Sequence, residues 1–265
     1  MSDPADVLAD ATVTLAEALG PTLLGLYVHG SWVAGDFALE RSDLDLLAVL
    51  AGQPDEQVLD ALGDAHEGLD ARHPAWRGRL EVEYVGVDTV AAFAGGGTDP
   101  GGHRIARVSP GEALHLLPAT THRLLTWSSV RSGGRALAGP PPVELLPSVE
   151  PAAVLTAVLD HVRDWPTWVE GMTGAGGQSY AVLTLCRARN VVVDGVQVSK
   201  RRAADRALTE WPAWEALIVW ARDWWYAGGS DDEPSRHEEV RSFVDDASRR
   251  ILASDASTRR SRPSA

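Results

Sequence analysis

The chain has 265 residues, of which 45% are hydrophobic, so it can form one large domain or two ordinary ones with a real core. Its formal net charge of −13 argues against a general nucleic-acid binder, which needs a basic surface to neutralise phosphates. No apolar run approaches the roughly 18 residues of a membrane span, and the N-terminus lacks a basic leader segment. The single cysteine, Cys186, excludes an intramolecular disulfide. We therefore expect a cytoplasmic monomer with a buried Cys186, no membrane segment and no nucleic-acid partner.

The first half of the chain mixes helical and strand-like hydrophobic patterns. Apolar spacing predicts helices over residues 6–19 and 56–69, and strands over residues 23–28, 44–50 and 80–85. The strand over residues 44–50 is almost wholly apolar after its carboxylates, which is typical of a buried central strand. The glycine-rich residues 95–102 predict a loop, and residues 115–137 allow no firm assignment.

The character of the sequence changes after residues 139–147, where dense prolines prevent regular structure. Beyond them, apolar spacing predicts helices over residues 152–165, 179–193, 201–211, 214–226 and 235–252. The last twelve positions are small, polar and basic. The sequence therefore predicts a sheet-containing domain over residues 1–146, a helical domain over residues 147–253 and a disordered tail over residues 254–265.

A small Gly30-Ser31 corner between the first two predicted strands is followed by two carboxylates, Asp43 and Asp45. Side chains alternate along a strand, so the two aspartates share one face, about 6.5–7 Å apart. Carboxylates this close repel each other unless a cation lies between them, and hard oxygen ligands suit Mg²⁺. The corner lets backbone N–H groups approach a phosphate. A lone Asp-x-Asp pair is also common on solvent-facing strands, but the longer pattern indicates phosphoryl or nucleotidyl transfer.

A third carboxylate from the neighbouring strand would complete a metal site or serve as a general base. Glu81 and Glu83 are the candidates, and because they are two residues apart they lie on the same face of the third predicted strand. Periodicity does not choose between them. We expect one of the two, Glu83, to be an ordinary solvent-facing residue.

At the Gly30-Ser31 corner and the Asp43/Asp45 strand, the chain resembles the polymerase-beta-type nucleotidyltransferases. Over most of its length it resembles the streptomycin/spectinomycin (aminoglycoside) adenylyltransferases. The matching segments are Pro21-Thr-Leu-Leu, Ser42-Asp-Leu-Asp-Leu-Leu, Leu80-Glu-Val, Ala136-Leu-Ala-Gly-Pro and Val182-Leu-Thr-Leu-Cys-Arg187. The resemblance implies an α+β fold, in which a polymerase-beta-like nucleotidyltransferase domain with a mixed sheet flanked by helices precedes an all-helical domain that closes the active-site cleft.

The resemblance also implies a reaction and a set of residues. The reaction is Mg²⁺-dependent transfer of AMP from ATP to a hydroxyl of a small, cationic, aminoglycoside- or aminocyclitol-like acceptor, with release of pyrophosphate. The implied roles are metal ligation by Asp43, Asp45 and Glu81, general-base catalysis by Glu81, and nucleotide binding by Gly30, Ser31, Arg187 and Lys200.

The acceptor side of the resemblance is incomplete. Trp165 or Trp168 could supply one acceptor-binding tryptophan of the family, but residues 102–114 contain none. Where the family has an acidic residue, this chain has Gly176-Gly-Gln-Ser179, which leaves no partner for a guanidinium group. These departures argue against streptomycin and leave another aminocyclitol open. The alternatives are a nucleotidyltransferase that modifies a protein hydroxyl and a non-catalytic nucleotide-binding module.

Overall fold

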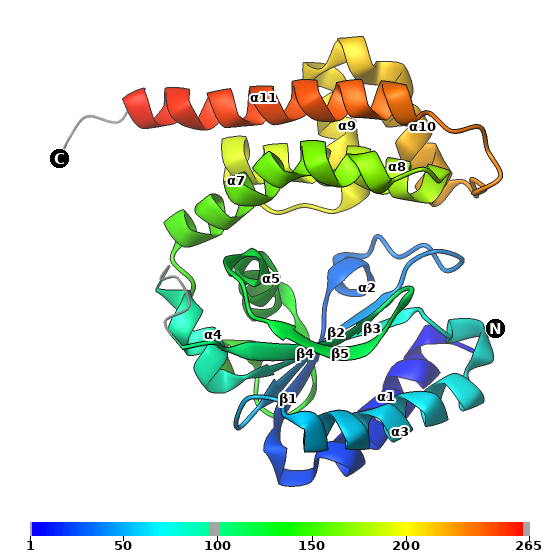
Figure 1. The fold of residues 1–265 in the computed structure, drawn as a ribbon, viewed down its shortest axis with the longest axis vertical. Helices are drawn as coiled ribbons and strands as arrows, with labels where there is room; N and C mark the ends of the chain where they lie inside the picture. Colours follow the sequence, from blue (N-terminus) through cyan, green and yellow to red (C-terminus); the bar gives the residue numbers. More distant parts are fainter. Residues whose placement is uncertain (1, 96–100, 262–265) are drawn as a thin grey trace. The chain divides into compact units, whose positions relative to one another are not determined.

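The computed structural model describes residues 2–95 and 101–261, and the chain divides into two compact units. Unit 1 comprises Met1–Phe37 and Ser42–Val154, and unit 2 comprises Ala38–Arg41 and Leu155–Ala265. The division falls inside a helix, α7 (Pro151–Trp168), and the domain boundary after residue 146 stays a prediction. The α+β fold class is confirmed, because unit 1 holds a mixed sheet flanked by helices and unit 2 is helical (Figure 1).

Unit 1 is built on one six-stranded sheet with the order β5-β4-β3-β2-β1-β6. Its strands are β1 (Leu23–Val28), β2 (Leu44–Leu50), β3 (Leu80–Gly86), β4 (Arg104–Ser109), β5 (Glu112–Pro118) and β6 (Arg135–Ala138). Strands β2 and β3 are parallel, and the other neighbouring pairs are antiparallel. The segment that the sequence left unassigned contains most of β5, the helix α5 (Leu124–Gly133) and part of β6.

The two faces of this sheet differ in chemistry. Helices α1 (Pro4–Leu19) and α3 (Glu56–Arg72) lie side by side on one face and bury apolar strand residues such as Leu46 and Val82 (Figure 1). The opposite face carries the carboxylates of β2 and β3. This division follows from strand geometry, since successive side chains point to opposite faces.

Two short helices also belong to unit 1. The helix α2 (Gly30–Ala34) directly follows β1, where the sequence predicted only a corner, and α4 (Val87–Ala94) follows β3. A third helix of one turn, α6 (Pro142–Leu145), lies within the proline-rich segment, which is therefore not wholly irregular. The predicted glycine-rich loop lies mostly outside the described residues.

Unit 2 is arranged around a central helix. Its remaining helices are α8 (Ala175–Arg189), α9 (Lys200–Glu210), α10 (Glu215–Tyr226) and α11 (His237–Ser261). Helix α8 is buried along most of its length and packs against α9, α10 and α11. Cys186 is fully buried in α8 as predicted, and burial raises the pKa of its thiol. This cysteine is therefore an inert packing residue.

Helix α11 continues to Ser261, which makes the backbone of residues 254–261 helical where the sequence predicted a disordered tail. No glycine or proline interrupts the chain between His237 and Ser261, and Ile251 is buried, so the helix continues from a packed segment. Within the described ranges, the helices are too short or too polar for any of them to cross a membrane.

Candidate active site

Asp45 and Glu81 lie directly opposite each other on the parallel strands β2 and β3, and Asp43 immediately precedes β2. Neighbouring strands are about 4.8 Å apart, so the two paired carboxylates share one patch of the sheet face. Burial and the charge of Asp45 raise the pKa of Glu81 to about 7. No side chain in the described part of the chain forms a hydrogen bond or an ion pair with the Glu81 carboxylate. Glu81 is therefore a carboxylate without a structural partner, close to a second carboxylate.

Gly30 lies against the Asp45 side chain at the start of α2. Its φ angle is +65°, which favours glycine, and a Cβ at this position would lie 2.8 Å from Asp45 Cγ. The preceding residue, His29, donates its backbone N–H to the Asp45 carbonyl at 3.0 Å. The structure therefore brings the Gly30-Ser31 corner beside Asp45, where a Cβ would force the carboxylate to move and the positive φ would strain any other residue.

The predicted metal ligands supply hard oxygen donors, the type that Mg²⁺ prefers. Over residues 2–95 and 101–261, no three His, Cys, Asp or Glu side chains are gathered closely enough to hold a metal ion as they stand. Burial and repulsion from Asp45 nevertheless outweigh the opposing effects of Arg107 and Arg123 on the pKa of Glu81. A divalent cation would relieve that repulsion, so the donor set fits Mg²⁺, and ligation stays a prediction.

Glu83 is buried, so the prediction that it faces solvent was wrong. Its exposed fraction is 4%, and its two carboxylate oxygens have separate partners. Trp127 Nε1 donates to Oε1 at 2.6 Å, and Arg123 Nη1 lies 3.3 Å from Oε2. Strand periodicity identifies the face on which Glu83 lies, but it cannot show that α5 covers that part of the face.

Two predicted nucleotide contacts lie in unit 2. Arg187 is in α8, and its Nε is buried with no hydrogen-bond partner in the described ranges. Lys200 is the first residue of α9, and its Nζ lies 3.4 Å from the centre of the Trp225 ring and 5.2 Å from that of Tyr180. Both cations are thus partly enclosed by protein rather than extended into solvent, and contact with phosphate stays a prediction for each.

The two candidate acceptor-binding tryptophans are neighbours in α7 but differ in exposure. Their ring centres are 5.7 Å apart, and the His161 ring lies 4.7 Å from that of Trp168. Trp165 is 1% exposed, and its Nε1 has no hydrogen-bond partner among the described residues, whereas Trp168 is 38% exposed. Trp168 therefore offers a ring face to a ligand, and Trp165 packs behind it.

Three comparisons with known proteins agree with one another. A family model described as the C-terminal domain of aminoglycoside adenylyltransferase matches residues 144–250. Two curated proteins named aminoglycoside (3'') (9) adenylyltransferase, from Shigella flexneri and Klebsiella pneumoniae, are each 28% identical over 273 residues, covering 90% of this chain and 94% of the relative. Over most of its length, the chain is therefore similar to aminoglycoside adenylyltransferases.

A similar solved structure is a spectinomycin adenyltransferase from Enterococcus faecialis, crystallised with ATP and spectinomycin. It superimposes with a TM-score of 0.77 at 16% identity, and the match covers 94% of this chain and 100% of the other. The likeness shows a shared fold. The named homologues and this structural match are adenylyltransferases, which are nucleotidyltransferase enzymes.

One carboxylate near α8 is not recognisable from the sequence. Asp231 lies between α10 and α11, and its Oδ1 accepts the backbone N–H of Gly176 at 2.8 Å. A carboxylate is therefore present beside Gly176-Gly-Gln-Ser179, although those four residues contain none. Because Asp231 is 55 residues away in sequence, no local pattern could have identified it.

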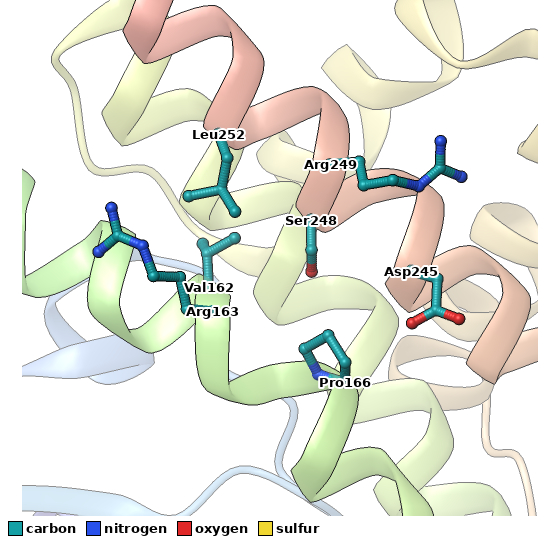
Figure 2. Close-up of a pocket in the computed structure, with 7 residues that line it drawn as sticks. All are labelled: Val162, Arg163, Pro166, Asp245, Ser248, Arg249 and Leu252. Atoms are coloured by element: carbon teal, nitrogen blue, oxygen red, sulfur yellow. The ribbon is translucent and has the colours of Figure 1, made fainter.

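A separate cavity of about 470 Å³ opens between α7 and α11. Its lining residues are Val162, Arg163, Pro166, Asp245, Ser248, Arg249 and Leu252. Figure 2 shows Leu252 and Ser248 of α11 facing Val162 and Pro166 of α7. None of the residues predicted for the adenylyltransferase site lines it, so cavity volume alone does not locate the chemistry in this protein.

Proposed function

We propose that this chain transfers AMP from ATP to a hydroxyl group of spectinomycin or a closely related aminocyclitol. The observation that carries the proposal is the pairing of Asp45 with Glu81 on adjacent strands, with Gly30 against the Asp45 carboxylate. The solved relative that binds ATP and spectinomycin supports this choice of donor and acceptor, as do the names of the curated relatives.

In the proposed reaction, Glu81 takes the proton of the acceptor hydroxyl. Its carboxylate has no structural partner within the described ranges and is only partly exposed, which suits a general base. The hydroxyl oxygen forms a bond to the α-phosphorus of ATP, the bond from that phosphorus to the bridging oxygen breaks, and pyrophosphate leaves.

Asp43, Asp45 and Glu81 would hold Mg²⁺. When bound there, the ion would neutralise charge that develops on the reacting phosphate. The backbone of Gly30 and Ser31 would contact the triphosphate from unit 1, and Arg187 and Lys200 are proposed to contact its phosphates from unit 2. The buried, unpartnered Nε of Arg187 supports an anionic ligand for that residue, because a buried donor without an acceptor is costly.

Trp168 is proposed to contact the acceptor. Its exposed ring can pack against the apolar face of an aminocyclitol and attract its ammonium groups. Asp231 adds a carboxylate at the start of α8, and this negative charge is proposed to attract a cationic acceptor. Both contributions are weaker and more adaptable than a bidentate guanidinium pair, which fits an acceptor other than streptomycin.

The test is a turnover assay with purified protein, ATP and Mg²⁺. Spectinomycin, streptomycin and other aminocyclitols are supplied one at a time, and pyrophosphate release and product mass are measured. We expect release only with an acceptor present, and a product that carries one AMP. If no drug in the panel causes pyrophosphate release and AMP is instead found attached to protein, the protein-modifying alternative is established.

A further inference from the structure

We propose that Glu83 is a positioning residue that holds the Arg123 guanidinium away from Glu81. The proposal rests on the assigned role of Glu81 in the proposed function. Glu83 binds the Arg123 guanidinium, which would otherwise pair with the Glu81 carboxylate. Glu81 then stays available to the acceptor and the metal.

The two glutamates are close neighbours with opposite surroundings. They lie two residues apart on the same face of β3, which corresponds to about 6.5–7 Å along the strand. The charge of Arg123 acts on Glu81, yet its ion pair is formed with Glu83, at 3.3 Å. The guanidinium therefore binds Glu83 on the sheet face that also carries Glu81, two residues away on the same strand.

Arg123 and Trp127 act on Glu83 as a pair. Arg123 is the N-cap residue of α5 and has helical backbone angles, and Trp127 follows four residues later in the helix, so their side chains lie on the same side. Trp127 occupies one oxygen of Glu83 and Arg123 the other. The side chains of Glu83 and Arg123 are only 6% and 20% exposed, so solvent cannot readily replace either partner. If Glu83 lost its charge, the proposal is that Arg123 would turn to Glu81, the other carboxylate on that face of β3.

A second arginine near Glu81 follows the same pattern. Arg107 lies opposite Glu83 on β4, and its charge also acts on Glu81. Its Nη2 donates to Glu112 at 2.7 Å, and Glu112 is also bonded by Ser109. Each arginine that influences Glu81 is thus held by a different carboxylate. This arrangement keeps positive charge near the site without neutralising the base by direct contact.

The test compares three variants with the wild-type protein: Glu83→Gln, Arg123→Gln and the double variant. Glutamine keeps an oxygen that can accept from Trp127 and removes only the charge that binds Arg123. We expect Glu83→Gln to lower kcat about tenfold or more while the KM for ATP changes little, because pairing with Arg123 makes Glu81 a weaker base. We expect Arg123→Gln to keep most of the activity. The double variant should recover most of the kcat lost in Glu83→Gln.

Recovery in the double variant is required by the proposal, but removing both members of a buried ion pair also relieves the cost of the unpaired Arg123 charge. Urea unfolding of each variant and the position of Arg123 therefore separate positioning from a structural role: a loss of kcat in Glu83→Gln that merely follows a loss of stability would overturn the proposal. Wild-type kcat in Glu83→Gln, or a double variant no more active than Glu83→Gln, would overturn the proposal. A crystal structure of Glu83→Gln gives a readout that is independent of turnover. We expect the Arg123 guanidinium within about 4 Å of the Glu81 carboxylate, and a guanidinium in any other place also overturns the proposal.

The structural readout also separates the two proposals. If the wild-type protein releases no pyrophosphate with any acceptor, the proposed function fails, whereas the position of Arg123 in the Glu83→Gln crystal still decides whether Glu83 holds it off Glu81. If turnover is normal in the wild-type protein and in Glu83→Gln, only the positioning proposal fails.

Discussion

One face of the unit 1 sheet has two adjacent rows of paired side chains, and each row contains a glutamate of β3. The two glutamates, Glu81 and Glu83, differ in whether other side chains bind them. In one row, Asp45 lies opposite Glu81, and Glu81 has no structural partner in the described part of the chain. In the next, Glu83 lies between Leu47 and Arg107 and is bound by residues of the α5 region. The difference arises from what covers each row. Glu83, whose two carboxylate oxygens are bonded to other side chains, contributes to the structure. Glu81, which lies beside Asp45 and has no such bonds within the described ranges, is available for chemistry.

The largest expected effect comes from removing the charge of Glu81. We expect Glu81→Gln to lower kcat by about 10²–10⁴-fold, because the base that takes the acceptor proton is lost. Stability should be unchanged or slightly higher, since the wild-type carboxylate has no partner to lose and is repelled by Asp45. Pyrophosphate release and urea unfolding measure the two quantities. A variant that turns over like the wild-type protein would contradict the assignment of Glu81.

The second prediction concerns the glycine beside the same row. Gly30→Ala places a methyl group against the Asp45 carboxylate and should both destabilise the protein and abolish turnover. Gly35→Ala is the matched control, because Gly35 also has a positive φ, +68°, but has open space around its Cα. We expect the control to lose only the roughly 1–2 kcal/mol of an L-residue in that conformation, with activity retained. Equal losses in both variants would show that contact with Asp45 is unimportant.

The third prediction tests the structural character of the Glu83 row. Trp127→Phe keeps an aromatic ring and removes the N–H that donates to the buried carboxylate. We expect the free energy of unfolding to fall by about 1.5–3 kcal/mol, because a buried charged acceptor loses a hydrogen bond. Urea denaturation measures this change, with Glu81→Gln as the comparison in the other row. A loss no larger than that of Glu81→Gln would remove the distinction between the rows.

The smallest expected effect lies on the opposite face of the sheet. His66 bonds Tyr84 of β3 at 2.7 Å, and burial lowers the pKa of His66 to about 4 from its ordinary 6.5. Between these values the unfolded chain binds a proton that the folded protein does not. The stability contributed by neutral His66 is therefore complete above pH 6.5 and is lost as the pH falls towards and through about 4.

Urea unfolding at pH 7 and pH 5 measures this dependence. We expect the fall in stability between the two pH values to be smaller in His66→Gln than in the wild-type protein, because the variant lacks the titrating imidazole. An identical fall would show that His66 is not the group responsible. Activity at pH 7 should be retained in this variant, since His66 is on the face away from the carboxylates.

The sequence predicted much of the site because the relevant signals are local. The alternation of apolar and acidic residues in β2 and β3 places Asp45 and Glu81 on one face, and the Gly30-Ser31 corner follows directly from the end of β1. It failed at Glu83 because the partner that buries it, Trp127, is 44 residues further along the chain. It also gave no sign of Asp231, because that residue is 55 residues from Gly176, the residue it bonds.

By itself, then, the sequence determined the strands that carry Asp45 and Glu81, the faces of those strands and the family resemblance, all of which depend on residue spacing along a few turns or strands. Only the tertiary structure decided that Glu83 is bonded by other side chains and that Glu81, on the same face of the strand, is not bonded by any described side chain. That choice depends on the parallel register of β2 with β3 and on the placement of α5 over one row of the face. Both are contacts between segments far apart in the chain, and no local pattern encodes them.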